Sequence, residues 1–294
     1  MIPMKILVLG ATGMLGHKVI QILSREHTVY GTVRKKLPIK GHPVFGKMNL
    51  IENIDALHFN TLISEIHKIE PDVIVNSIGI VKQLPEAHDP IKSISINSLF
   101  PHQLASVCRN SGIRLIHYST DCVFSGNKGN YSEEDFPDAN DLYGRTKLLG
   151  ELNEKNCLTI RTSIIGRELT SSHGLIEWFL SQNGKSVQGF RKVIFSGLTT
   201  NAHAEILEKI IVEYPHISGL YHVSSQSISK LDLLNLVRDI YDLKIEIFPN
   251  DYEISDRSLN SQKFKSKTKI FIPGWREMIE EMHRDSTPYS NLRD

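Results

Sequence analysis

Three glycines, spaced three residues apart, follow a short aliphatic run near the start of this 294-residue chain. Residues 5–10 read KILVLG, and Gly13 and Gly16 complete the motif GATGMLG as an apolar helical stretch begins at 15–23. Such a run is typical of a buried parallel strand. Glycines between a strand and a helix permit a tight turn and let backbone N–H groups approach a pyrophosphate. A simple turn with a helix-packing contact is the alternative, but the strand–turn–helix context favours a dinucleotide-binding fold.

The segment after the second expected strand, at 28–33, indicates which dinucleotide binds. A carboxylate here would accept hydrogen bonds from a ribose 2′-hydroxyl and indicate NAD. The chain instead continues with Arg34 and Lys35. A guanidinium suits phosphate geometry well, so Arg34, together with Lys35, predicts a 2′-phosphate site and NADP, with NADPH preferred over NADH. The alternative is an ordinary solvated basic turn.

Strand and helix patterns alternate along residues 1–165. Further strand runs lie at 73–77, 114–119 and 158–161, with a weaker one at 44–48, and helical periodicity lies at 61–70, 91–110 and 141–156. This alternation implies right-handed crossovers and an α/β fold, a Rossmann-type doubly wound parallel sheet.

The alternation breaks down in the remainder of the chain. Helical patterns occupy 175–180, 202–214, 229–241 and 275–284, and short strand patterns occupy 220–224 and 245–248. We therefore predict an NADP-binding domain with the catalytic residues at 1–165 and a small C-terminal α+β substrate-binding lobe at 166–285, interleaved with the main sheet. We expect the polar tail at 286–294 to be frayed.

Composition argues against several kinds of partner. The chain is 40% hydrophobic and 23% charged, and its formal net charge of +1 disfavours nucleic acid or an acidic membrane as the main partner. No signal-peptide pattern or membrane span is evident. We expect no metal, because His173, His203 and His222 lack metal-ligand spacing. Reduced thiols and a cytoplasmic location are expected from cysteines that lack paired spacing, namely Cys108, Cys122 and Cys157.

The stretch 117–150 brings together the groups of a proton-transfer site. Tyr143 and Lys147 are four residues apart, so on a helix they share one face. A free phenol has a pKa of about 10, and the Lys147 ammonium would lower the pKa of Tyr143 toward neutrality, where it serves as a general acid or base. Thr120 ends the preceding strand run, where a doubly wound sheet places its ligands. This combination disfavours the alternative of a surface Tyr–Lys pair.

The motifs GATGMLG, STDCVFSGNKGNY, YGRTK and RTS occur in this order along the chain. Together they resemble the extended short-chain dehydrogenase/reductases, specifically the dTDP-4-dehydrorhamnose reductase-like group, most clearly over residues 4–163. The resemblance implies an NAD(P)-dependent oxidoreductase that acts on nucleotide-linked 4-keto-6-deoxy sugars. It assigns Thr120 as the hydroxyl member of a catalytic triad, Tyr143 as the acid and Lys147 as its partner.

The resemblance and the glycine-rich motif define a set of expected cofactor contacts. Residues 76–83 follow a strand and should face the cofactor crevice, where Gly79 allows close backbone approach. In relatives, an asparagine matching Asn97 supports the active-site lysine through a water; helix packing is the alternative. Asn49 replaces an adenine-side Asp and can still bond to adenine. Besides Tyr143 and Lys147, the expected cofactor contacts are Gly10, Thr12, Gly13, Met14, Leu15, Gly16, Arg34, Lys35, Asn49, Leu50, Ser77, Ile78, Gly79 and Asn97.

The substrate side departs from the family pattern. Relatives commonly have Tyr where this chain has Cys122 and an aromatic where it has Ile164, which leaves the sugar open. Lys82 would reach a phosphate or a sugar hydroxyl, or be merely solvated. Arg191 would supply charge, and Trp178 would stack on a base or lie in the core. The expected substrate contacts are Lys82, Thr120, Asp121, Cys122, Arg161, Trp178 and Arg191, with Gln188, Lys192 and Thr199 as further candidates.

Three functions are compatible with these residues. The main hypothesis is an NADPH-dependent reductase of a nucleotide-diphospho-4-keto-6-deoxy sugar in surface polysaccharide synthesis. The second is a nucleotide-sugar epimerase or dehydratase with a regenerated cofactor; the dehydratases have a second acidic residue where Cys122 follows Asp121 here. The third is a non-catalytic cofactor-binding regulatory subunit, which the retained Thr–Tyr–Lys set disfavours. The helices at 91–110 and 141–156 correspond to those that pair in dimeric relatives, so we expect a homodimer.

Overall fold

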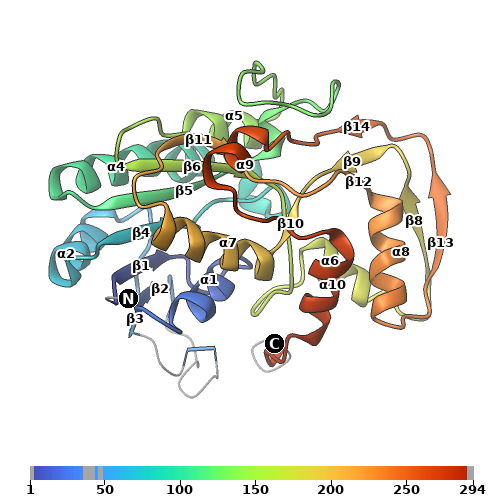
Figure 1. Ribbon diagram of the computed structural model, residues 1–294, viewed down its shortest axis with the longest axis horizontal. Coiled ribbons are helices and arrows are strands. Elements are labelled where there is room, and N and C mark those ends of the chain that lie inside the picture. Colours follow the sequence, from blue (N-terminus) through green and yellow to red (C-terminus); the bar gives the residue numbers. More distant parts are fainter. Residues whose placement is uncertain (1–2, 36–43, 46–48, 290–294) are drawn as a thin grey trace.

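The computed structural model describes residues 3–35, 44–45 and 49–289 of the chain. Within these residues, a seven-stranded parallel sheet forms the centre of the fold, in the order β11-β6-β5-β4-β1-β2-β3 (Figure 1). Its strands are β1 (Lys5–Leu9), β2 (Thr28–Thr32), β3 (Asn49–Ile51), β4 (Val73–Asn76), β5 (Arg114–Thr120), β6 (Cys157–Thr162) and β11 (Gly219–His222). The strand order reverses between β1 and β4, and open α/β sheets bind ligands at the carboxyl ends of strands at such a point. The expected Rossmann-type doubly wound sheet is confirmed.

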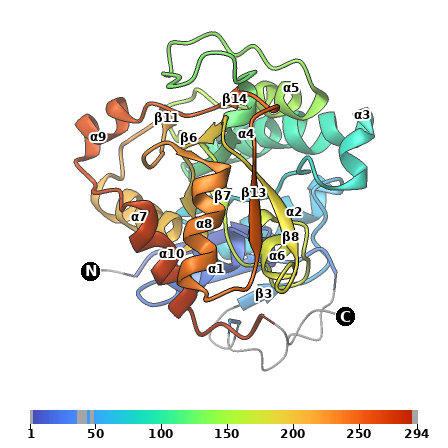
Figure 2. The same cartoon turned by 90° about the vertical axis from the view of Figure 1, so that its right-hand side faces the viewer.

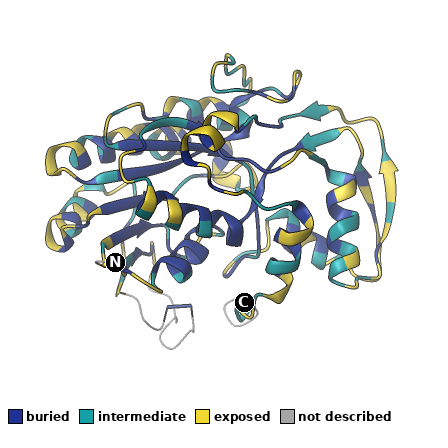
Figure 3. Cartoon of the chain, viewed as in Figure 1, coloured by how far each residue is buried: buried dark blue, intermediate teal, exposed yellow. Residues whose placement is uncertain are grey.

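The strands of the central sheet are largely buried (Figure 3). Alternate residues of β1 enter two separate cores, one on each face of the sheet. Ile6 and Val8 pack with helices α1 and α7 on one face, and Leu7 and Leu9 pack with α2 and α4 on the other. All these β1 side chains are fully buried. A strand buried on both faces explains why the sequence there is a continuous aliphatic run. The covering helices are α1 (Gly16–Leu23), α2 (Phe59–Ile69), α4 (Phe100–Ser111), α5 (Leu142–Leu149) and α7 (Thr200–Glu213).

The helical stretch expected at 91–110 is interrupted by a π-helical turn, Ile94–Leu99, between α3 (Pro90–Ser93) and α4. Pro101 explains the interruption, because its nitrogen has no hydrogen to donate to the carbonyl of Asn97 one helical turn earlier. That carbonyl lies close to Gly150, where an added Cβ would come within 2.0 Å of the oxygen. The π-helical turn therefore contacts the end of α5. π-Bulges of this kind occur frequently at functional sites.

Residues beyond 165 contribute to both parts of the molecule. β11 pairs in parallel with β6, and α7 packs against α1, so this region completes the central sheet and covers one of its faces. The remainder forms a lobe beside the sheet, with α8 lying next to the β8–β13 pair (Figure 2). The lobe and its connections comprise β7 (Ile164–Ile165), α6 (Leu175–Leu180), β8 (Ser186–Phe190), β9 (Val193–Phe195), β10 (Leu198–Thr199), β12 (Ile228–Ser229), α8 (Lys230–Ile240), β13 (Glu246–Asn250), β14 (Ser255–Asp256), α9 (Gln262–Thr268) and α10 (Trp275–Arg284).

Two expected elements differ in extent from the structure. The strand expected at 44–48 is not formed by Val44 and Phe45, which lie in a turn, while 46–48 lie outside the described residues. The third strand of the sheet is β3 instead. The helix expected at 141–156 ends at Leu149, because the chain at Gly150 passes too close to the Asn97 carbonyl for any side chain.

The tail also differs from the expectation of a frayed end. Thr287 accepts hydrogen bonds from Lys18 and Gln21 on α1, and Tyr289 is only 4% exposed. The expectation failed because polar residues at a chain end can be held by buried partners that are far away in sequence. Residues 290–294 lie outside the described part of the chain.

Candidate active site

The glycine-rich loop between β1 and α1 has the shape that a dinucleotide requires. Gly10 adopts φ of +82°, and the N–H of Gly13 donates to the Gly10 carbonyl at 3.0 Å. A Cβ on Gly16 would lie 2.1 Å from the same carbonyl oxygen, so only glycine fits at the start of α1. This tight turn leaves backbone N–H groups at the helix N-terminus open to a pyrophosphate. Thr12, Gly13 and Met14 line the accessible side, whereas the Leu15 side chain is buried and only its backbone can contribute.

The loop after β4 lies against the glycine-rich loop. An added Cβ on Gly10 would come within 3.2 Å of both Ser77 Oγ and Ile78 Cγ1. Ser77 Oγ donates to the Leu9 carbonyl at 2.5 Å, and the Ile78 N–H donates to Asn76 Oδ1 at 3.1 Å. The bond from Ser77 to Leu9 holds the carboxyl ends of β1 and β4 together at the reversal of strand order, and the bond from Ile78 to Asn76 fixes the turn after β4. The predicted cofactor contacts Ser77 and Ile78 therefore line the same crevice as the glycines.

The predicted adenosine end lies at the carboxyl end of β2. Arg34 and Lys35 follow β2 after Val33 and are exposed. Asn49 and Leu50 lie in the neighbouring strand β3, where Asn49 pairs with Tyr30 and Leu50 with Gly31. An added Cβ on Gly31 would lie 2.9 Å from Ala11 Cβ, so a larger residue would force its neighbours to shift. The predicted cation pair therefore follows β2, and the predicted adenine-side residues lie in the adjacent strand.

The predicted catalytic residues meet at the carboxyl end of β5. Thr120, the last residue of β5, accepts a hydrogen bond from the Cys122 N–H at 3.1 Å and donates to Asp121 Oδ1 at 3.2 Å. Its hydroxyl also lowers the pKa of the Tyr143 phenol, against the larger raising effect of burial. Asp141 caps α5 by accepting from the Gly144 N–H at 2.7 Å, which fixes the turn that carries Tyr143.

The pKa of Tyr143 is not lowered below its ordinary value, although Lys147 is on the same helix. Its buried Nζ donates to the Tyr118 carbonyl at 2.6 Å, and burial lowers the pKa of Lys147 to about 8, opposed by the charge of Glu151. Burial also raises the pKa of Tyr143 well above its ordinary value, with Cys122 adding to the shift and the Thr120 hydrogen bond opposing it. The expected lowering toward neutrality is therefore wrong for this arrangement. Burial is the largest cause of the shift, and it disfavours the charged form of the phenol.

Asn97 lies in the π-helical turn and fixes the loop that faces Lys147. Its Oδ1 accepts from the Ile80 N–H at 2.8 Å, and its Nδ2 donates to the Ile80 carbonyl at 3.0 Å and to Thr146 Oγ1 at 3.3 Å. A Cβ on Gly79 would lie 3.4 Å from Asn97 Oδ1 and 3.9 Å from Lys147 Nζ. Because Gly79 has no side chain, the Asn97 amide and the Lys147 ammonium both lie next to its backbone.

Three of the predicted substrate contacts lie beside the catalytic hydroxyl. Lys82 forms an exposed ion pair with Asp141, the cap of the catalytic helix, at 2.9 Å. Asp121 is buried next to Thr120, and burial raises the pKa of its carboxyl, against the lowering effect of the Arg257 charge. Burial likewise raises the pKa of the Cys122 thiol to about 12, so the thiol stays neutral. Cys122 is thus a small uncharged side chain next to the catalytic hydroxyl.

Arg161 is a structural residue and not the expected substrate contact. Its guanidinium is 2% exposed and donates through Nε and Nη2 to the two carboxylate oxygens of Glu151, each at 2.7 Å. Nη1 lies 3.3 Å from His222 Nε2, and the Phe124 ring stacks at 5.2 Å. A bidentate ion pair of this kind leaves the cation satisfied inside the protein.

The other predicted contacts of the lobe differ in accessibility. Trp178 is 40% exposed on α6 and therefore does not lie in the core. Arg191 forms an exposed ion pair with Asp251. Thr199 is fully buried as the N-cap of α7, where it accepts from the Ala202 N–H, so it cannot hold a diphosphate.

Two cations near the catalytic hydroxyl are missing from the sequence-based prediction. Lys230 and Arg257 each follow a residue that pairs with Ile194 of β9, so the small sheet β12-β9-β14 brings them to one place. Arg257 donates to the carbonyls of Phe124 and Ser125, at 2.9 and 3.1 Å, in the loop after the catalytic Thr. Burial lowers the pKa of Lys230, and the nearby charge of Asp121 opposes this shift. Lys230 begins α8 and Arg257 directly follows the two-residue strand β14, so nothing in the local sequence pattern indicates that the two side chains lie close together.

The described part of the chain contains no cluster of His, Cys, Asp or Glu side chains suited to a metal ion. Across residues 3–35, 44–45 and 49–289, no helix is both long and apolar enough to cross a membrane. The candidate active site consists of the polar groups at the carboxyl ends of β1, β2, β4 and β5.

Known proteins resemble this chain over most of its length. The family model described as RmlD substrate binding domain matches residues 4–287. The probable low-salt glycan biosynthesis reductase Agl14 of Haloferax volcanii is 29% identical over 75% of this chain and 74% of its own length. Methionine adenosyltransferase 2 subunit beta of Mus musculus is 27% identical over 81% of this chain and 72% of its own length.

A solved structure shows the same fold at lower identity. The crystal structure of dTDP-4-dehydrorhamnose reductase from Bacillus anthracis in complex with NADP superposes with a TM-score of 0.81. It is 19% identical, and the match covers 96% of this chain and 99% of that one. The expected family is therefore confirmed: the chain belongs to the RmlD substrate binding domain family and is an oxidoreductase of the extended short-chain dehydrogenase/reductase class.

Proposed function

We propose that this protein is an NADPH-dependent reductase of a nucleotide-diphospho-4-keto-6-deoxy sugar. The observation that carries the proposal is the meeting of Thr120, Tyr143 and Lys147 at the end of β5, beside the crevice formed by the glycine-rich loop. A relative named as a glycan biosynthesis reductase and a neighbour of the same fold crystallised with NADP support the reaction and the cofactor. Membership of the RmlD family supports the sugar nucleotide as substrate.

The glycine-rich loop is suited to hold the pyrophosphate of NADPH, because any Cβ at Gly16 would fill the turn. Arg34 and Lys35 are exposed where a 2′-phosphate would bind. Bound NADPH supplies the hydride that reduces the carbonyl carbon. The side chains of Thr120, Tyr143 and Lys147 would then act at the carbonyl oxygen of the substrate.

Thr120 would donate a hydrogen bond to the substrate carbonyl and orient it. Tyr143, whose raised pKa keeps the phenol protonated at neutral pH, would give its proton to the oxygen as negative charge develops there. The Lys147 ammonium would stabilise the resulting phenolate through its positive charge. A protonated phenol is the form needed for reduction, so the raised pKa suits this direction of reaction.

The cations around Asp121 suit a substrate that carries a diphosphate. Lys230, Arg257 and Lys82 come from three separate segments, and the charges of Arg257 and Lys82 act on Lys230. Clustered like charges disfavour one another, and an anion placed among them relieves that repulsion. We assign them to the phosphate groups of the sugar nucleotide.

A Tyr143→Phe variant tests the proposal. It removes the transferable proton and keeps the ring, so kcat for NADPH oxidation with 4-keto-6-deoxy sugar nucleotides should fall by about 10²–10⁴-fold. NADPH affinity, measured by fluorescence titration, should change little. Tyr252→Phe, on an exposed tyrosine, is the matched control and should leave turnover unchanged. Undiminished turnover in Tyr143→Phe would overturn the assignment of the acid.

Stoichiometry separates reduction from the epimerase or dehydratase alternative. A reductase consumes one NADPH for each product molecule, whereas an enzyme with a regenerated cofactor forms product without net loss of absorbance at the NADPH band. Both quantities can be measured on the same UDP-, dTDP- and GDP-linked sugars. Product without NADPH consumption would favour the alternative.

The 27% identity to methionine adenosyltransferase 2 subunit beta favours one second candidate, a cofactor-binding subunit of another enzyme. Such a protein would co-purify with a partner in fixed stoichiometry and would bind NADPH without reducing any sugar nucleotide. The assembled Thr120, Tyr143 and Lys147 argue for the reductase, because a subunit without its own chemistry has no need of all three.

A further inference from the structure

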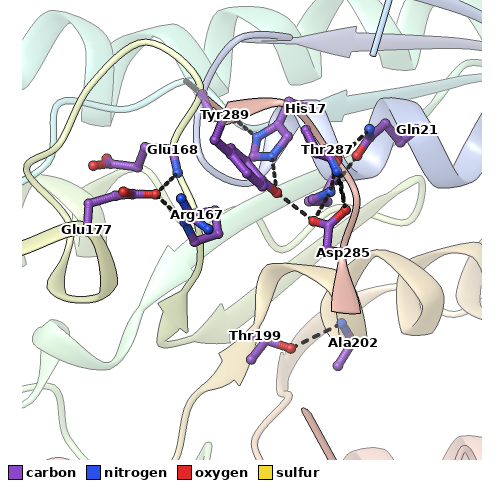
Figure 4. Close-up of polar contacts among 12 residues, drawn as sticks. His17, Gln21, Arg167, Glu168, Glu177, Thr199, Ala202, Asp285, Thr287 and Tyr289 are labelled. Carbon is purple, nitrogen blue, oxygen red and sulfur yellow. Dashed lines mark hydrogen bonds and ion pairs between the residues drawn. The ribbon is translucent and has the colours of Figure 1, made fainter. Parts of the chain in front are cut away.

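The end of the chain crosses α1 next to the glycine-rich loop (Figure 4). Asp285 forms an ion pair with the buried Lys18 of α1. Thr287 Oγ1 accepts from Lys18 Nζ at 2.8 Å and from Gln21 Nε2 at 3.1 Å, and donates to Asp285 Oδ1 at 2.8 Å. Residues 285–289 form what we call the C-terminal strap. Its polar groups are tied to one face of α1.

His17 links this strap to the glycine-rich loop. It directly follows Gly16 and is fully buried, and its Nδ1 lies 2.9 Å from the carbonyl oxygen of Gly13. Its Nε2 lies 3.4 Å from the Tyr289 hydroxyl, and the two rings meet edge to face with centroids 5.7 Å apart. The hydroxyl in turn donates to Asp285 Oδ2 at 2.6 Å. A continuous polar chain therefore runs from Asp285 to Gly13, the middle glycine of the loop.

Tyr289 also contacts residues 44–45, which precede β3, and the start of the C-terminal lobe. Its ring packs with Val44 and Phe45, which precede β3, and with Leu169. The Arg167 guanidinium stacks on the same ring at 4.6 Å and is itself held by Glu177 at 2.6 Å. One side chain thus joins the glycine-rich loop, the segment before β3 and the start of the C-terminal lobe.

We propose that the C-terminal strap preorganises the dinucleotide site, with Tyr289 and His17 as positioning residues for the cofactor. The inference rests on the proposed dinucleotide binding at the glycine-rich loop. A pyrophosphate is bound by backbone N–H groups, whose directions are set by the loop conformation. Without the strap, part of the free energy of NADPH binding would be spent on ordering the glycine-rich loop and residues 44–45. Neither residue touches the reacting atoms, so binding should weaken more than chemistry.

The test compares Tyr289→Phe and Tyr289→Ala with wild type. Loss of the hydroxyl alone should raise the Kd for NADPH a few-fold, and loss of the ring should raise it about tenfold, equivalent to about 1.4 kcal/mol. KM for NADPH should rise in parallel, while kcat stays within about twofold, as expected for lost ground-state binding. The control is Tyr252→Ala, which removes an exposed tyrosine of the lobe and should leave Kd unchanged.

Hydrogen exchange on the cofactor-free chain gives a second readout. In Tyr289→Ala, the amides of residues 13–17 should exchange faster than in wild type, while those of β5 should keep their protection. Faster exchange throughout the chain would show a general loss of stability and overturn the specific role of the strap.

The two proposals fail in different ways. If wild type does not bind NADPH, the proposed function fails, and the exchange of residues 13–17 still decides whether the strap holds the loop. If wild type binds NADPH and both Tyr289 variants bind it equally well, the strap proposal is overturned and the reductase proposal stands.

Discussion

At the scale of single residues, Lys147 combines burial with a required positive charge. Only 6% of the residue is exposed, and burial brings its pKa down to about 8. The ammonium therefore dominates at neutral pH and is lost within the range of ordinary assays. Tyr143 behaves in the opposite way, because its raised pKa keeps the phenol protonated through the same range. The alkaline side of the pH profile should therefore report on Lys147.

We predict that kcat for sugar-nucleotide reduction falls as the pH rises through about 8. Below this pH the ammonium is present and stabilises the phenolate that forms on Tyr143; above it the amine is neutral and the rate should decline by roughly tenfold per pH unit. Steady-state rates at saturating NADPH between pH 6 and about 10 would measure the decline, with circular dichroism to show that the fold persists. A flat profile across this range would contradict the role of the ammonium.

The residues that sequence reasoning identified are those whose role depends on local spacing. Tyr143 and Lys147 share one helix, and the glycines share one loop, so short-range pattern was sufficient. Arg161 was misassigned because its partner Glu151 lies across an irregular connection, where no periodicity indicates a buried ion pair. Lys230 and Arg257 were missed because only the pairing of β12 and β14 with β9 brings them to the catalytic loop.

At the scale of elements, the π-helical turn and α5 expose apolar side chains on the outside of the molecule. Leu99 is 52% exposed and Leu149 is 63% exposed, and Ile91 in α3 is 79% exposed. His102 Nε2 lies 2.8 Å from the Leu149 carbonyl, so α4 and the end of α5 adjoin. Exposed apolar groups on adjoining helices are typical of an interaction surface. These are the helices whose resemblance to dimeric relatives led us to expect a homodimer.

We predict that a Leu99→Asp, Leu149→Asp double variant is monomeric where wild type is dimeric. Two carboxylates would have to lose their hydration at the interface without a partner, which costs several kcal/mol. Light scattering coupled to size-exclusion chromatography would measure the mass. A variant with Ile254→Asp and Phe271→Asp, at exposed apolar residues of the lobe, is the matched control and should remain a dimer. A monomeric wild type would refute the expectation.

The bounds of helices and strands were predictable where the hydrophobic pattern is periodic. The prediction failed where the pattern does not mark the boundary. The alternation of strands and helices over residues 1–165 was sufficient to predict the doubly wound sheet. Pro101, which cannot donate a backbone hydrogen bond, lies just after the π-helical turn. Gly150, the C-cap of α5, lies against the Asn97 carbonyl. The strands β7, β10, β12 and β14 are two residues long, which is too short for any alternation to appear in the sequence.

At the scale of the whole molecule, the part of the chain after residue 165 is required for the core of the part before it. β11 pairs with β6 at one edge of the central sheet. Ile206, Leu207 and Ile210 of α7 are buried against the face that also holds α1. Burial of each such side chain contributes about 1.5–3 kcal/mol, and the net stability of a whole domain is only about 5–15 kcal/mol. The C-terminal strap adds another connection, from Tyr289 back to His17.

We predict that the full chain unfolds in one cooperative transition and that a fragment of residues 1–165 does not fold. Both tryptophans, Trp178 and Trp275, lie after residue 165, so their fluorescence reports on the C-terminal region, while circular dichroism reports on every helix and strand. Coincident urea midpoints by the two probes are the mark of a two-state transition. Separate midpoints, or a fragment that shows a cooperative transition of its own, would mean that the sheet is stable without β11 and α7. Coincidence in the full chain, together with an unfolded fragment, would show that the cofactor site and the substrate lobe share one folding unit.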